Sequence, residues 1–169
     1  MERAYDITIR EFGSSHTRLA RICIGLAKAH GGLKDYGRQQ EHARVAYDIY
    51  KSWMGPAHLL VAYALLELGN AQMQLGNPSE AVSILNQSHT ILERELGMES
   101  AEAAMAMRSL GVAKGSLGEV VAAEELLERA CSVFKRNFGS SHVLVETTMS
   151  ALLQLNTSLS EDRPQKMFG

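Results

Sequence analysis

The chain has 169 residues, of which 46% are hydrophobic and 21% are charged, a composition typical of one globular domain with a continuous core. Lysine and arginine number 17 against 19 acids, giving a formal net charge of -2. This balance excludes an overall basic field that would hold nucleic acid by counterion release. No apolar run approaches the roughly 18 residues needed to span a bilayer, and no secretory leader pattern opens the sequence. We therefore expect a cytoplasmic protein with neither a nucleic-acid nor a membrane partner.

Four similar loops recur at a fixed interval along the chain. Their glycines are Gly13, Gly55, Gly97 and Gly139, each 42 residues after the one before. The first, second and fourth loops also contain a histidine three residues after the glycine, namely His16, His58 and His142. A fixed period of tens of residues indicates a solenoid, in which each unit buries its apolar face against its neighbours.

This period divides residues 1–159 into successive helical units of one repeat domain. Residues 1–15 are expected to form a partial unit, whose helix near 3–12 is a second helix without a first one. Three full units follow over residues 16–57, 58–99 and 100–141, each with a first and a second helix. A polar last helix at 142–159 is expected to cap the stack, which makes eight helices. Residues 160–169 lack helical apolar spacing and are predicted to form a flexible tail.

The expected opening helix has apolar residues at Tyr5, Ile7, Ile9 and Phe12. Because it has no first helix to pair with, part of its apolar face lacks a partner within the chain. Exposed apolar patches commonly mark contacts. We therefore predict that either a longer chain supplies the missing helix or two copies form a homodimer through this end.

Residues seven apart in each first helix are expected to form a buried stripe, because this spacing puts their side chains on one helix face. Two leucine columns and an alanine column have it. The columns are Leu26, Leu68, Leu110 and Leu152; Leu33, Leu75, Leu117 and Leu159; and Ala29, Ala71 and Ala113. We predict that all three columns lie in the core.

The helix ends also have recognisable signals. In the turn Gly76-Asn77-Pro78, Asn77 is expected as the N-cap and Pro78 at the first helical position, with Glu80 as the capping-box partner. The four loop glycines are expected to end the second helices as left-handed caps. The large residues before them are predicted to pack under the turns, namely Phe12, Met54, Leu96 and Phe138.

Leucine-glycine pairs in the first helices, Leu68-Gly69 and Leu110-Gly111, are each followed by a small, large, small triplet. The triplets are Ala81, Leu85 and Ser88, and Ala123, Leu127 and Ala130, with a weaker copy in which Gln39 replaces the first small residue. This pattern resembles the tetratricopeptide repeat, and 42-residue units with a Gly-x-x-His loop resemble kinesin light chains and similar adaptors. The resemblance implies an all-α, right-handed solenoid of antiparallel helix pairs. It also implies a non-enzymatic adaptor, whose first helices line a concave groove for a peptide or helix.

No residue pattern indicates a catalytic site, a cofactor or a bound metal. The loop histidines belong to successive layers about 8–10 Å or more apart, too far to share one ion, so we expect them to brace the loops. Cys23 and Cys131 lie in different units and lack metal-ligand neighbours, so they are expected to be buried free thiols. The charged run Glu124, Glu125, Glu128 and Arg129 is expected on a solvated outer face.

The candidate binding residues lie on the face of the first helices that the core columns leave unused. They are Arg21, Ile24 and Lys28; Tyr63, Leu66, Asn70 and Met73; and Met105, Arg108 and Val112. Three are basic, none is acidic and most of the others are apolar, which predicts an acidic-apolar peptide as ligand. Two alternatives stay open, a structural oligomerisation segment and the ligand-sensing repeat region of a larger signalling protein.

Overall fold

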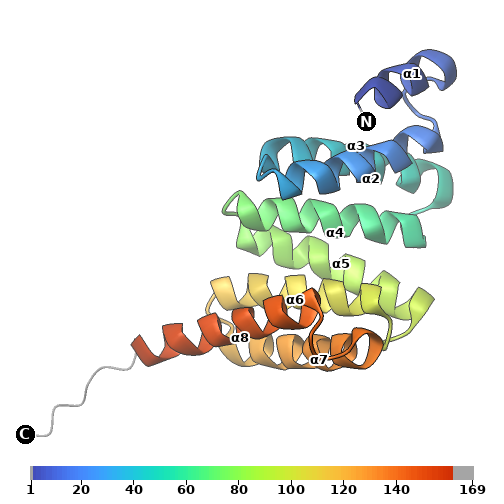
Figure 1. Cartoon of the computed structure of the whole chain (residues 1–169). Coiled ribbons are helices and arrows are strands. Elements are labelled where there is room, and N and C mark those ends of the chain that lie inside the picture. Colours follow the sequence, from blue (N-terminus) through green and yellow to red (C-terminus); the bar gives the residue numbers. More distant parts are fainter. Residues whose placement is uncertain (1, 162–169) are drawn as a thin grey trace, which may run out of the picture.

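The computed structural model describes residues 2–161, which form eight α-helices and no strand. The helices are α1 (Glu2–Phe12), α2 (Thr17–Gly32), α3 (Tyr36–Met54), α4 (Leu59–Gln74), α5 (Pro78–Leu96), α6 (Ala101–Ser116), α7 (Val120–Phe138) and α8 (Val143–Glu161). Successive helices pack against each other in a stack, with α1 and α8 at its two ends (Figure 1). The expected all-α solenoid is confirmed. Helix α8 runs two residues further than expected, so the predicted tail does not begin at residue 160, and residues 162–169 lie outside the description.

Close crossings hold the first helix of each pair against the second. A Cβ atom on Gly69 of α4 would lie 2.6 Å from Leu85 Cγ of α5, and one on Gly111 of α6 would lie 2.9 Å from Leu127 Cγ of α7. At Ser88, the hydroxyl donates a hydrogen bond of 2.8 Å to the Ala62 carbonyl of the paired helix. The small residues of the repeat are therefore what allows the two backbones to approach.

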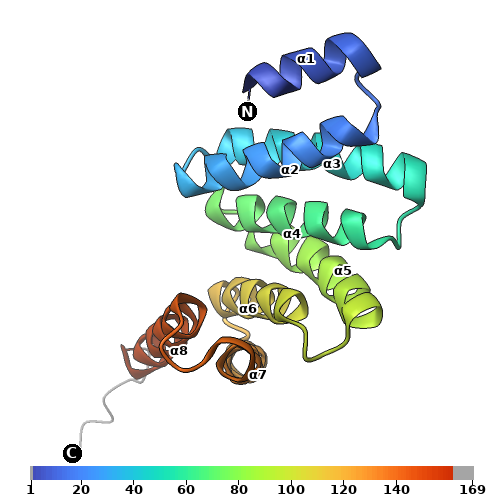
Figure 2. The ribbon, with the colours of Figure 1, turned by 45° about the vertical axis from the view of Figure 1, so that its right-hand side comes forward.

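Contacts between the pairs make the stack continuous. Each first helix contacts the next one, in the order α2, α4, α6 and α8, and each second helix packs against the first helix that follows it. Figure 2 shows α8 lying beside both α6 and α7. The first helices consequently form one uninterrupted surface.

Only one of the two leucine columns is buried. Leu26, Leu68 and Leu110 are buried and Leu152 is half-buried. The prediction was wrong for Leu33, Leu75 and Leu117, which are 77%, 42% and 39% exposed. These three are C-cap residues of α2, α4 and α6, so their side chains leave the stripe where the helix ends. Ala71 and Ala113 are buried but Ala29 is exposed, and the Leu159 side chain lies outside the description.

The loop glycines have the positive φ that was expected, between 81° and 85° at all four positions. Their ψ, where the C-caps give it, is 160–166°, so the chain leaves Gly55, Gly97 and Gly139 extended and not in the left-handed helical conformation. The predicted packing under these turns is wrong for Met54 and Leu96, which are exposed. Phe138 is also partly exposed, but its ring stacks on His142 of the same loop at 4.5 Å between centroids. The Phe12 side chain lies outside the description. The extended exit carries the chain straight away from the finished helix toward the start of the next one.

The start of α5 is as expected in position but not in bonding. Asn77 is the N-cap and Pro78 opens the helix, yet the Asn77 side chain makes no cap hydrogen bond. Instead its Nδ2 donates to Gln72 Oε1 at 3.0 Å. The capping box with Glu80 is therefore not formed.

Candidate peptide-binding groove

Three successive first helices line an open pocket of about 420 Å³, here called the central pocket. Its walls come from α2, α4 and α6, with the first turn of α3 closing one side. It is lined by Lys28, Gly31, Tyr36, Gln39, Glu67, Asn70, Met73, Gln74, Arg108, Ser109 and Val112. A smaller hollow of about 160 Å³ shares Lys28 with the central pocket and is lined by residues of α2, α3 and α4, namely Arg21, Ile24, Lys28, Tyr50, Leu60 and Tyr63.

Eight of the ten residues predicted for the groove line these two spaces. Lys28, Asn70, Met73, Arg108 and Val112 line the central pocket, and Arg21, Ile24 and Tyr63 line the hollow beside Lys28. The prediction is corrected for Leu66, which is 4% exposed and belongs to the core. Met105 is half-buried and packs against two core clusters. The apolar side chain of Leu66 packs among the other apolar residues of the core cluster, where it is removed from water.

Arg108 has an unusual environment for a guanidinium. Its Nε atom is buried and has no hydrogen-bond partner among the described residues. Burial lowers the pKa of Arg108 from its ordinary value, although an arginine stays charged at physiological pH. A buried N–H that has lost water without gaining an acceptor is costly. An anion arriving in the central pocket would therefore be stabilised here.

Glu67 is the one charged residue among the six pocket-lining residues that the sequence prediction did not include. It is 7% exposed, and its Oε2 accepts a hydrogen bond of 3.2 Å from Gln39 Nε2 of α3. Burial raises the pKa of the Glu67 carboxyl, while the Gln39 hydrogen bond and the charge of Lys28 oppose the rise. The predicted stripe contains no acid, but the pocket it leads to contains this one.

The sequence feature that points to a buried polar group such as Glu67 is Gln39. It replaces the first small residue of the repeat triplet and is buried, and a buried amide requires a polar partner. Gly31 makes room for it, because a Cβ atom at Gly31 would lie 2.7 Å from Gln39 Nε2. A search for the partner of Gln39 would have led to an acid or amide of the next unit.

The loop histidines are structural. His16, His58 and His142 each stand before the first helix of their unit, and Nδ1 of each accepts a hydrogen bond of 3.1–3.2 Å from the backbone N–H two residues later. At the equivalent position of the third loop, Ser100 Oγ accepts from the Ala103 N–H at 3.2 Å. The predicted loop-bracing role is confirmed. Within residues 2–161, no three His, Cys, Asp or Glu side chains are placed to hold a metal ion.

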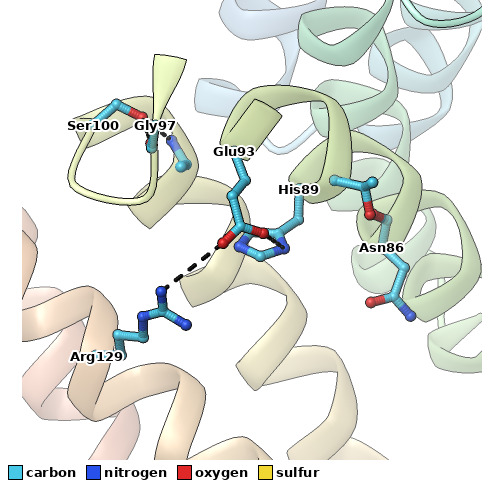
Figure 3. A network of polar contacts seen from close by, with 8 residues as sticks. Asn86, His89, Glu93, Gly97, Ser100 and Arg129 are labelled. Atoms are coloured by element: carbon cyan, nitrogen blue, oxygen red, sulfur yellow. Dashed lines mark hydrogen bonds and ion pairs between the residues drawn. The ribbon is translucent and has the colours of Figure 1, made fainter. Parts of the chain in front are cut away.

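Polar contacts on the second helices join neighbouring units. Glu93 of α5 lies between His89 of its own helix, at 3.9 Å, and Arg129 of α7, also at 3.9 Å (Figure 3). Burial lowers the pKa of His89 although Glu93 opposes the shift. Arg129 thus connects two layers of the stack from an exposed position.

The remaining candidate for chemistry is the thiol of Cys23. It is fully buried, and burial raises its pKa to about 11. A thiol rather than a thiolate therefore exists at neutral pH, and thiols are poor nucleophiles.

None of the described helices is both long and apolar enough to cross a membrane.

The fold and the groove define a helical-repeat solenoid with its open surface on the first helices. Residues 60–136, less than half of the chain, match the family model described as "Tetratricopeptide repeat". Among proteins with curated functions, none matches the sequence significantly.

Solved structures with this fold extend over nearly the whole chain. One is the crystal structure of a variant of the Podosopora anserina putative kinesin light chain "nearly identical TPR-like repeats". It has a TM-score of 0.74 at 22% identity, and the match covers 96% of this chain and 76% of that protein's chain. The apo form of RapI has a TM-score of 0.75 at 16% identity, and the match covers 94% of this chain and 57% of the RapI chain. BtubC (BKLC) from P. vanneervenii has a TM-score of 0.61 at 18% identity, and the match covers 89% of this chain and 68% of the BtubC chain. The resemblance to kinesin light chain-like repeats is confirmed for the fold.

Proposed function

We propose that this chain is a non-enzymatic interaction scaffold of the cytoplasm, whose first helices bind an acidic-apolar segment of a partner protein. The observation that supports this most is the Arg108 guanidinium in the central pocket, half-buried and with its Nε unpartnered among the described residues. Lys28 supplies a second positive charge across the pocket, and Met73 and Val112 supply apolar walls. A carboxylate flanked by apolar side chains complements this surface.

The environment of each pocket residue indicates what it contributes to binding. Burial of ligand side chains against Met73 and Val112 provides most of the binding free energy. Lys28 is exposed, so it mainly raises the association rate, and salt screens it over about 8–10 Å. Because an unstructured peptide loses conformational entropy on binding, we expect a dissociation constant in the micromolar range.

The test is a peptide array followed by fluorescence anisotropy on the strongest binders. We expect acidic-apolar peptides to be enriched and Arg108→Gln to weaken their binding at least tenfold at low salt. The matched control is Arg44→Gln, which removes an exposed arginine of α3 outside the pocket and should leave affinity unchanged. An array without acidic-apolar enrichment, or equal affinities for Arg108→Gln and wild type, would refute the proposal.

A second candidate function, oligomerisation through α1, is favoured by one observation. Ile7 is 45% exposed, although its equivalents one, two and three periods later, Ile49, Ile91 and Val133, are all buried. Ile49, Ile91 and Val133 pack in the core clusters of their units, and no first helix pairs with α1 among the described residues. Sedimentation velocity over a concentration series tests this, since Ile7→Glu should abolish a dimer and Val121→Glu, on the exposed start of α7, should not. A wild-type chain that stays monomeric throughout would exclude it.

A further inference from the structure

The central pocket contains an acid on the wall between its two bases. Glu67 lies on α4, Lys28 on α2 and Arg108 on α6, and the other groups that line the pocket near them are Tyr36 and Gln39 of α3 and Ser109 of α6. With Glu67 ionised, the three charged side chains sum to +1, and with Glu67 neutral they sum to +2. The state of this one carboxyl therefore decides how strongly the pocket attracts an anion.

The surroundings of Glu67 make its neutral form accessible. The side chain is buried, so ionisation costs hydration energy that an exposed glutamate keeps. Its hydrogen bond comes from the Gln39 amide N–H, and a protonated carboxyl can still accept this bond through its carbonyl oxygen. Burial raises the pKa of Glu67, and Lys28 and Gln39 only partly oppose that rise. The charge of Lys28 acts on Glu67, so a carboxylate bound beside Lys28 in the same pocket would act on Glu67 as well.

On this basis, and resting on the proposed function, we propose that Glu67 is the specificity-determining residue of the central pocket. A ligand carboxylate that binds in the central pocket beside Lys28 enters together with a proton from solvent, which the Glu67 carboxylate takes up. An ionised Glu67 repels the incoming carboxylate across the same small pocket, whereas a neutral one does not. Anion binding and proton binding therefore favour each other by linkage.

This coupling distinguishes acidic ligands from their neutral isosteres. An acidic-apolar peptide should bind more tightly as the pH falls, while the same peptide with Asn or Gln in place of its acids should show no such change. If the bound carboxylate raises the pKa of Glu67 by about one unit, the gain is about tenfold over the range in which Glu67 titrates. The ligand acids, with pKa values near 4, stay largely ionised at pH 5.5.

The experiment measures the affinity of the best acidic-apolar peptide and of its amide isostere at pH 5.5 and pH 7.5. Wild type should bind the acidic peptide several-fold more tightly at pH 5.5. With Glu67→Gln, binding should lose this pH dependence and at pH 7.5 should match or exceed wild type. The control variant Glu80→Gln removes an exposed acid in the first turn of α5 and should keep the wild-type pH dependence.

Calorimetry on the unmodified protein gives a second readout that needs no variant. Titrations in two buffers of different ionisation enthalpy should reveal proton uptake when the acidic peptide binds near pH 6, and none with its isostere. Equal pH dependence in wild type and Glu67→Gln, or binding without proton uptake, would overturn the coupling while leaving the proposed function intact if Arg108→Gln still weakens binding at least tenfold. If no acidic peptide binds at either pH, the proposed function fails and the coupling with it.

Discussion

Truncation of Leu68 tests the packing that defines the repeat. Leu68 is 1% exposed and lies in the largest core cluster, so Leu68→Ala leaves a cavity that the close crossing of α4 and α5 prevents from collapsing. We expect the free energy of unfolding to fall by about 2–5 kcal/mol. Leu75, seven residues later, is the C-cap of the same helix and 42% exposed. Its truncation should cost no more than about 0.5 kcal/mol, as for an ordinary surface change.

The two variants form a matched pair, because they remove the same atoms from one helix. Urea titrations followed by circular dichroism give both values from the linear dependence of the unfolding free energy on denaturant. Similar losses for both variants would contradict the assignment of one leucine column to the core and the other to the helix ends. A loss below about 0.5 kcal/mol for Leu68→Ala would mean that the repeat register is wrong.

Three further predictions concern other parts of the fold. In denaturant titrations, Gly69→Ala should cost about 1–3 kcal/mol through its clash with Leu85, and a neutral effect would contradict the close crossing. His58→Ala, which removes the acceptor for the Leu60 N–H, should cost about 0.5–2 kcal/mol, and elemental analysis finding stoichiometric zinc in wild type would oppose its structural role. Because burial raises the folded pKa of Glu67, wild type loses stability as pH rises from about 4.5 through that pKa, so Glu67→Gln should be the more stable protein at pH 8 and lose this advantage near pH 4.

The helix pairs could be predicted because they depend on residues close together in sequence. The crossing at Gly69 and Leu85 repeats at Gly111 and Leu127, so one unit confirms the interpretation of the next. The error in the second leucine column has a local cause. A spacing of seven indicates a common face only while the helix lasts, and these helices end just before Leu33, Leu75 and Leu117.

The central pocket could be predicted only in part, because it depends on contacts between units. The stripe that contains Lys28 and Arg108 follows from helix geometry. Glu67 stands in an apolar run between Leu66 and Leu68, and nothing near it in sequence explains how it is tolerated there. Its partner is Gln39, 28 residues earlier in the previous unit. Each residue departs from its repeat column, Gln39 from Ala81 and Ala123 and Glu67 from Gly25 and Ser109. Neither column, however, indicates that the two side chains meet.

The most direct test of the account is where an acidic-apolar peptide binds. The methionines are convenient probes, since Met73 lines the central pocket while Met98 and Met149 are exposed elsewhere on the molecule. In a methyl-methionine NMR titration, we predict that the Met73 resonance shifts progressively with peptide and that Met98 and Met149 do not move. Shifts at Met98 or Met149 with an unchanged Met73 would show that the partner binds outside the first-helix groove, and the central claim would be wrong.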